Sequence, residues 1–285
     1  MAVIIDGKLV SQKTRENIKA QVEEFKVNNG IVPGLAVIVV GNNPASAVYV
    51  RNKHKATMEV GMNSYQIELP EDTCEDVLLE KIAEFNSDPS VNGILVQLPL
   101  PRHISEKKVI AAISPNKDVD AFHPQNVGRI MIGDYDLLPC TPAGIMKLID
   151  FYGISVEGKR CVVIGRSNIV GKPMAHLLLE RNGTVTVCHS KTNNLYDITR
   201  DADIVVVAIG KAKFLTSKMI KQGAVVIDVG INRDENGKLV GDVDFESASE
   251  VASYITPVPG GVGPMTISML LENTLTAAKK QLGSS

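Results

Sequence analysis

Short runs of apolar, β-branched residues recur along this chain between longer stretches with helical spacing. Most of these runs lack an alternation of polar and apolar residues, which is typical of strands covered by helices on both faces of a parallel sheet. The sequence therefore predicts an α/β fold built on parallel strands. The runs cover residues 35–40, 94–98, 161–164, 184–187, 204–209 and 224–229.

The segment Leu138–Pro142 predicts a boundary between two domains. Its Leu-Pro-Cys-Thr-Pro sequence interrupts regular structure, and Thr141 followed by Pro142 favours the start of a helix. Downstream, a strand, a glycine-containing turn, a helix and a second strand follow in the order of a nucleotide-binding unit. We expect a cleft between a first domain of residues 1–140, joined by a C-terminal helix of about 266–285, and a Rossmann-like domain of residues 141–265.

The charge pattern argues against polyanionic partners. The 30 basic residues nearly balance the 32 acidic ones, and no run of lysine or arginine interrupts the chain. A nucleic acid or an anionic membrane surface is therefore not an expected partner, and a small molecule is. Asp6 and Lys8 interrupt the beginning of the chain too early for a signal peptide, and the apolar runs are too short to span a bilayer. We expect a cytoplasmic protein.

Cysteine and histidine spacing indicates no metal centre. The four cysteines lie far apart without a C-x-x-C pair, and the five histidines include no H-E-x-x-H motif. Neither a disulfide framework nor a metal site is expected.

A turn at Gly165–Pro173 is a candidate phosphate-binding loop. It follows an apolar strand and precedes an amphipathic helix, so its free N–H groups would face a pyrophosphate. It departs from G-x-G-x-x-G because Ser167 replaces the second glycine and Gly171 comes one residue late. A tight turn without a ligand is the alternative interpretation.

The end of the next strand favours NADP over NAD as the cofactor. NAD sites usually carry an acidic residue there, whereas this chain continues Cys188-His189-Ser190-Lys191 without a carboxylate. Arg166 and Ser190 are candidates for binding a 2′-phosphate, with Lys191 adding positive charge. Taken singly, Arg166 and Lys191 are also compatible with ordinary surface cations.

One lysine interrupts an apolar helical face in the first domain. Tyr49, Lys53, Ala56 and Val60 are spaced to share that face. One interpretation is that Lys53 extends its amine to solvent. Alternatively, partial burial would disfavour its ammonium form and let it exchange protons with a substrate, with Tyr49 one turn away to bond the amine or stack on a flat ligand.

Three further segments carry candidate ligand-binding groups. Gln97 ends an apolar strand at the edge where open α/β sheets bind ligands, and Asp118 and Asp120 follow in a loop. The segment Pro257–Pro264 contains glycines that allow close approach of backbone to a ligand. Each feature alone also has a structural interpretation, as a bonded glutamine, a capping aspartate or a tight turn.

Together, these segments resemble the bifunctional methylenetetrahydrofolate dehydrogenase/cyclohydrolase family. Matches in the family's order run from Ile5 to Thr274, so the likeness covers nearly the whole chain. One departure is Ala121, which follows Asp118-Val119-Asp120 where the family usually has glycine. The segments that carry the resemblance are Tyr49–Lys53, Val96–Pro101, Gly165–Pro173 and Pro259–Thr266.

The resemblance implies oxidation of 5,10-methylenetetrahydrofolate with NADP, followed by hydrolysis to 10-formyltetrahydrofolate, by a homodimer. It implies that Lys53 is the general base and acid of the hydrolysis and that Gln97 orients it. Tyr49 would support the lysine and the folate, and Asp120 would accept hydrogen bonds from the pterin. Further implied contacts are Pro259, Gly260 and Gly261 to the substrate, and Gly165, Arg166, Ser167, Ser190 and Ile231 to the cofactor.

Three alternatives remain open from sequence. A monofunctional dehydrogenase would accumulate the methenyl product. An enzyme that uses Lys53 as a Schiff-base nucleophile would be trapped on that lysine by borohydride. A folate- or nucleotide-binding protein would bind ligand without turnover.

Overall fold

The computed structural model describes residues 2–41 and 44–283 and divides the chain into two units. The six-stranded unit comprises the described residues of Met1–Gln12 and Thr141–Thr266. The three-stranded unit comprises those of Lys13–Cys140 and Ile267–Ser285. Residues 2–12 thus differ from the predicted division, because strand β1 (Val3–Ile4) pairs with β11 (Tyr254–Ile255) of the six-stranded sheet.

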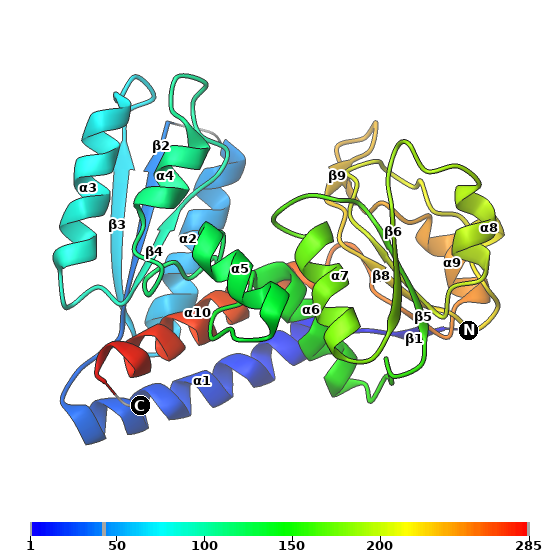
Figure 1. The fold of residues 1–285 in the computed structure, drawn as a ribbon, viewed down its shortest axis with the longest axis horizontal. Helices are drawn as coiled ribbons and strands as arrows, with labels where there is room; N and C mark the ends of the chain where they lie inside the picture. The colour runs from blue at the N-terminus through cyan, green and yellow to red at the C-terminus, as the bar shows by residue number, and fades with distance from the viewer. Residues whose placement is uncertain (1, 42–43, 284–285) are drawn as a thin grey trace. The chain divides into compact units, whose positions relative to one another are not determined.

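The six-stranded sheet has the order β1-β11-β8-β7-β5-β6, and every neighbouring pair is parallel. Helices α6 and α7 lie on one side of it, and α8 and α9 on the other (Figure 1). Its elements are α6 (Cys140–Phe151), β5 (Arg160–Ile164), α7 (Gly171–Glu180), β6 (Thr184–Cys188), α8 (Leu195–Arg200), β7 (Ile204–Val207), a 3₁₀ turn (Ser217–Met219), β8 (Val225–Asp228), the antiparallel pair β9 (Asn232–Arg233) and β10 (Leu239–Val240), and α9 (Phe245–Val251).

Coverage of both faces explains the unbroken apolar strands of this unit. Val162 and Ile164 of β5 pack into a core with Leu195 of α8 and Ala248 of α9. Alternate residues of the same strand point to the opposite face, where α7 contacts β5 and β6. The strand order reverses at β5, which places a ligand-binding crevice at the carboxyl ends of β5 and β7.

The three-stranded sheet has the parallel order β3-β2-β4. Its middle strand β2 is buried along its whole length, and Leu78 and Ile82 of α3 pack against it. Helices α2 and α3 lie on opposite sides of this sheet in Figure 1. The elements are α1 (Gly7–Asn29), β2 (Gly34–Val40), α2 (Pro44–Glu59), β3 (Asn63–Leu69), α3 (Glu75–Ser87), β4 (Gly93–Val96), α4 (Glu106–Ala112), α5 (Pro124–Ile132) and α10 (Val262–Gln281), of which α1 and α10 each begin in the six-stranded unit.

Two helices begin earlier than the sequence predicted. Helix α10 starts at Val262 rather than Thr266, because Gly263 and Pro264 fall in its first turn, where proline costs no hydrogen bond. Helix α6 starts at Cys140, one residue before the predicted cap. None of the described helices combines the length and the apolar character that crossing a bilayer requires.

Candidate active site

Lys53 and Gln97 meet at the carboxyl end of the three-stranded sheet. Lys53 lies on α2 with only 9% of its surface exposed, and its Nζ donates to Oε1 of Gln97 at 2.9 Å. Nε2 of Gln97 donates to the carbonyl of Leu98 at 2.6 Å, so the amide oxygen is the atom that faces the lysine. The lysine therefore has a fixed partner inside the protein instead of extending to solvent.

The strand order brings these two residues together. Helix α2 follows β2, and Gln97 follows β4, which is the parallel neighbour of β2. The main-chain N–H of Gln97 donates to the carbonyl of Ile38 at 2.8 Å, which continues the pairing one residue beyond β4. The order β3-β2-β4 reverses at β2, so the pair occupies the switch point at which open α/β sheets bind ligands.

Asp120 is the carboxylate of this site. Burial raises its pKa to about 6, the charge of Lys53 opposes that rise, and the charge of Asp118 adds to it. The thiol of Cys140 donates to its Oδ1 at 3.7 Å. No main-chain amide of the described residues donates to this carboxylate, which leaves it free to accept hydrogen bonds from a ligand.

Asp118, two residues earlier, has a structural role. Its Oδ2 accepts hydrogen bonds from the main-chain N–H of His123 at 2.8 Å and from Nδ2 of Asn126 at 2.9 Å. Burial raises the pKa of Asp118 and these bonds lower it. The carboxylate thus holds the loop to the start of α5, where His123 is the cap.

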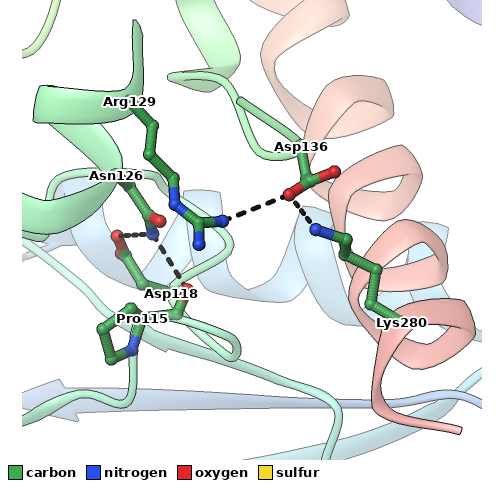
Figure 2. Close-up of polar contacts among 6 residues, drawn as sticks. All are labelled: Pro115, Asp118, Asn126, Arg129, Asp136 and Lys280. Carbon is green, nitrogen blue, oxygen red and sulfur yellow. Dashed lines mark hydrogen bonds and ion pairs between the residues drawn. The ribbon is translucent and has the colours of Figure 1, made fainter. Parts of the chain in front are cut away.

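Side chains of helices α5 and α10 hold the loop that carries Asp118 and Asp120. In Figure 2, Asn126 of α5 bonds both Asp118 and the carbonyl of Pro115. Arg129 of α5 donates to Asp136 at 3.3 Å, and Lys280 of α10 forms an ion pair with the same carboxylate. On α10, Asn273 also donates to the carbonyls of Val119 and Leu138 at 2.8 and 2.7 Å, so the loop that carries Asp120 is fixed at several points.

Ala121 adopts a backbone conformation that favours glycine. Its φ is +56° and its side chain is fully buried. A residue with a Cβ pays a steric penalty in the left-handed region, which gives a physical reason for glycine at this position in the family. The methyl group is tolerated here beside Asp120.

The remaining predicted substrate residues are placed differently. Tyr49 lies one turn before Lys53 on α2 and is 43% exposed. Pro259, Gly260 and Gly261 belong to the six-stranded unit. Gly260 has a φ of +109°, and a Cβ on Gly261 would lie 2.6 Å from the carbonyl oxygen of Pro257, so both glycines are also required by the turn itself.

A cavity of about 470 Å³ opens in the six-stranded unit, beside residues that follow β5, β6 and β7. Arg166 and Ser190, both predicted from sequence, line it, together with the basic residue Lys211. No aspartate or glutamate occurs among its described lining residues. The full lining is Ile164, Gly165, Arg166, His189, Ser190, Thr192, Leu195, Ala208, Ile209, Lys211 and Phe214.

Ser167 and the two glycines shape the turn beside this cavity. The Ser167 hydroxyl accepts hydrogen bonds from the N–H groups of Val170 and Gly171, each at 3.2 Å, and so holds the turn to the first residue of α7. A Cβ on Gly165 would collide with the carbonyl of Ala208, and one on Gly171 with the carbonyl of Gly165. The departures from G-x-G-x-x-G therefore serve the packing of this turn. Ser167 is not among the described residues that line the cavity.

Two family models match this chain. The catalytic domain of tetrahydrofolate dehydrogenase/cyclohydrolase matches residues 5–120. The NAD(P)-binding domain of the same family matches residues 139–282. The chain belongs to the tetrahydrofolate dehydrogenase/cyclohydrolase family.

Members of this family match along the whole chain. The "Bifunctional protein FolD" of Acetivibrio thermocellus is 63% identical over 280 residues, which cover 98% of each chain. The crystal structure of the bifunctional enzyme FolD from Campylobacter jejuni matches with a TM-score of 0.96 and 52% identity, covering 99% of this chain and 100% of that one. The Trypanosoma brucei enzyme, complexed with NADP and an inhibitor, matches with a TM-score of 0.95 and 41% identity over 99% and 98% of the two chains.

These matches confirm the family and the two-domain α/β fold predicted from the sequence. Three predicted cofactor contacts, Gly165, Arg166 and Ser190, line the cavity, whereas Ile231 is 54% exposed and does not belong to its described lining. Sequence reasoning missed Lys211 and Cys140. Neither carries a periodic signal, because each acquires its neighbours only from the order of the strands or the folding of a loop.

Proposed function

We propose that Lys53, Gln97 and Asp120 form the folate-processing centre of this bifunctional enzyme. The protein oxidises 5,10-methylenetetrahydrofolate to the methenyl form with NADP and hydrolyses that product to 10-formyltetrahydrofolate. The observation that supports the assignment of residues is the 2.9 Å bond between Lys53 and Gln97 beside a carboxylate that has no main-chain donor among the described residues.

Lys53 serves the hydrolysis as general base and acid. Water adds to the methenyl carbon as the amine of Lys53 accepts one of its protons, and the product is a neutral carbinolamine. The bond between this carbon and the ring nitrogen N5 then breaks: the protonated amine gives its proton to N5, and the carbinolamine hydroxyl loses its own proton to solvent as it becomes the formyl carbonyl. One proton is released overall, and the amine of Lys53 returns to its unprotonated starting state.

Three neighbours position this reaction. Gln97 directs its amide oxygen at Nζ of Lys53 and thereby fixes where the amine points. Asp120 accepts hydrogen bonds from the amino-pyrimidine edge of the pterin, and Tyr49 supports the lysine and the ring. Pro259, Gly260 and Gly261 are further substrate contacts, an assignment that rests on the family resemblance.

NADP fits the cavity of the six-stranded unit. Its lining combines Arg166, Ser190 and Lys211 without a described carboxylate, which suits a 2′-phosphate and does not suit a bare ribose diol. When bound, NADP accepts the two electrons and the hydrogen that the methylene carbon loses. Arg166 and Ser190 would hold the 2′-phosphate. N–H groups of the turn before α7 other than those of Val170 and Gly171, which bond Ser167, would face the pyrophosphate.

Turnover with each cofactor tests the whole assignment. Purified protein is mixed with 5,10-methylenetetrahydrofolate and either NADP or NAD, and cofactor reduction, methenyl product and formyl product are followed separately. We expect NADP reduction together with formyl product. Methenyl product alone would indicate a monofunctional dehydrogenase, and binding without turnover would indicate a binding protein.

Arg166→Ala tests the 2′-phosphate site. Loss of a charge-assisted hydrogen bond should raise the KM for NADP roughly 10- to 100-fold, with a much smaller change for NAD. Lys159→Ala, at an exposed position before the amino end of β5, is the control and should change both values only slightly. Equal weakening of NADP and NAD by Arg166→Ala would contradict the assignment.

We also propose that the protein is a cytoplasmic homodimer. The resemblance to the family supports this assembly, and β6 supports it as the outer strand of its sheet, with Val187 40% exposed. The molar mass in solution, measured by light scattering, should be twice that of the chain, and Val187→Lys should lower it. A monomeric mass for the wild type would contradict the proposal.

A further inference from the structure

Asp242 holds three consecutive main-chain amides in the six-stranded unit. Its carboxylate accepts the N–H groups of Ile209, Gly210 and Lys211 at 2.7, 3.0 and 2.8 Å, and the residue is fully buried. Consecutive amides that converge on one point form a concave anion site. In this protein, a side chain of the chain itself fills that site, so the loop after β7 has its shape set by one carboxylate.

The same carboxylate reaches the loop after the neighbouring strand. Oδ1 of Asp242 accepts a hydrogen bond from Nδ2 of Asn232 at 2.9 Å. Asn232 lies two residues beyond Gly230. A Cβ on Gly230 would collide with the Asp242 carboxylate, which explains glycine there, since its φ does not require it. Asp242 therefore joins the segments that follow β7 and β8.

Both segments belong to the cofactor side of the unit. Ile209 and Lys211 line the cavity assigned to NADP, and Asn232 directly follows Ile231. We propose that Asp242 is a positioning residue for NADP binding, which acts by fixing the loop at residues 209–211 and the segment at residues 230–232. This inference rests on the proposed cofactor site and assigns no contact between Asp242 and the cofactor.

A second buried carboxylate, Asp228, bonds the main chain at Asp242. Its oxygens accept the main-chain N–H groups of Gly230, Asp242 and Val243, each at 2.9 Å. None of these donors belongs to the loop at residues 209–211. Asp228 thus places the backbone of Asp242, and Asp242 places the wall of the cavity, so the two acids have separate tasks.

Asp242→Asn tests the proposal. One carboxylate oxygen becomes an NH₂ group facing N–H donors, so the loop at residues 209–211 loses acceptors and gains a repulsive contact. We expect the KM for NADP to rise roughly 10- to 100-fold, while kcat at saturating NADP changes about threefold or less. The amides of residues 209–211 should also exchange with deuterium faster than in the wild type.

Hydrolysis of added 5,10-methenyltetrahydrofolate reports folding independently, because it needs no NADP and depends on Lys53 of the other unit. That rate should stay within about twofold of the wild type. Asp203→Asn is the matched control. Asp203 precedes β7 at the opposite end of the strand, where it accepts the N–H of Arg160 and pairs with Lys221, so its loss should leave the KM for NADP unchanged.

The outcomes separate the two proposals. If the wild type binds no NADP, the cofactor site itself is wrong. Suppose instead that the wild type binds NADP and that Arg166→Ala weakens NADP binding. If Asp242→Asn then leaves NADP binding unchanged, the Asp242 proposal alone is overturned. Should Asp242→Asn fail to fold, Asn232→Ala removes only one of the four donors, and an unchanged KM for NADP in that variant would overturn the proposal.

Discussion

Two buried lysines in the three-stranded unit solve the same physical problem in different ways. Lys53 is 9% exposed and Lys117 is 8% exposed, so the Nζ atoms of both need hydrogen-bond partners inside the protein. Nζ of Lys117 donates to the main-chain carbonyls of Phe85 and Asp88 at 2.9 and 2.7 Å. Nζ of Lys53 donates instead to the side-chain amide of Gln97.

The partners of Lys117 explain why it is structural. Helix α3 ends at Ser87, and the residue that would bond the carbonyl of Phe85 in a continuing helix is Pro89, which has no N–H. Lys117 replaces that missing donor, and its charge suits the negative end of the helix. Burial lowers the pKa of Lys117, but its position leaves no donor directed at a ligand.

Asp118 and Asp120 show the same contrast between a group bonded to main chain and one bonded to a side chain. Asp118 is committed to a main-chain N–H and to Asn126, whereas Asp120 is engaged by the Cys140 thiol among the described residues. The difference teaches that burial alone does not mark a catalytic group. A buried polar group whose partners are main-chain atoms holds the fold, and one bonded to a single side chain keeps further hydrogen-bonding capacity for a ligand.

Lys53→Met should produce the largest effect. Loss of the general base and acid is expected to lower the rate of methenyltetrahydrofolate hydrolysis about 10²- to 10⁴-fold. Because methionine fills a similar volume and the lysine makes one hydrogen bond, the free energy of unfolding should change by about 1 kcal/mol or less. Hydrolysis is followed from the absorbance of the methenyl substrate, and stability by urea unfolding.

Lys117→Met should show the reverse pattern. Removing the donor to the Phe85 carbonyl leaves the end of α3 unsatisfied, so the free energy of unfolding should fall by about 2–3 kcal/mol. Hydrolysis per folded molecule should stay near the wild-type rate, as urea unfolding and kinetics on the same sample would show. Equal losses of activity in both lysine variants would remove the distinction between them.

Asp120→Asn should trade activity for stability. Because the folded state raises the pKa of Asp120 to about 6, it binds the proton more tightly than the unfolded chain. The wild type therefore loses stability as pH rises from about 4 through 6, and the variant avoids that loss. At pH 8 its free energy of unfolding should be about 1–2 kcal/mol higher, with no gain at pH 4, while its KM for folate rises.

Asp118→Ala is the control for this change. It removes the acceptor of two hydrogen bonds and should lower the free energy of unfolding by about 2 kcal/mol at pH 4, with a smaller loss at pH 8, because the raised pKa of Asp118 means that its ionisation also costs the wild type stability as pH rises. A stability gain for Asp120→Asn that did not depend on pH would show that burial of its charge is not the cause.

Ala121→Gly should produce the smallest effect. Glycine relieves the left-handed backbone, but the variant loses a buried methyl group and gains entropy in the unfolded chain. The free energy of unfolding should change by about 1 kcal/mol or less, whereas Ala121→Val should lower it by more than about 2 kcal/mol. If valine were tolerated equally, the backbone at this position would not be constrained by its φ.

Much of the fold follows from the sequence because buried parallel strands leave a simple pattern. The apolar runs at 35–40 and 161–164 fall on β2 and β5 within one residue at each end. Strand β3 was missed because it lies at an edge, where Ser64 and Gln66 replace apolar residues. Strand β1 was missed because two residues carry no periodicity.

The candidate sites were predictable where motifs follow a strand and not where loops converge. Gln97 and Arg166 each follow an apolar strand directly, so the sequence located them. Lys211 and Asp242 depend on which strands become neighbours, and a single acidic or basic residue in a loop gives no sign of that. Likewise, the sequence gives no sign that Lys117 is buried, since only the folded end of α3 shows what Lys117 bonds.

The products formed by Lys53→Met from 5,10-methylenetetrahydrofolate and NADP test the account most directly. The variant should still reduce NADP, because the cofactor cavity is built from other residues, and should accumulate methenyltetrahydrofolate while the wild type proceeds to the formyl product. Formation of formyl product at the wild-type rate, or equal loss of both reactions in a variant that still binds folate and NADP, would contradict the role assigned to Lys53.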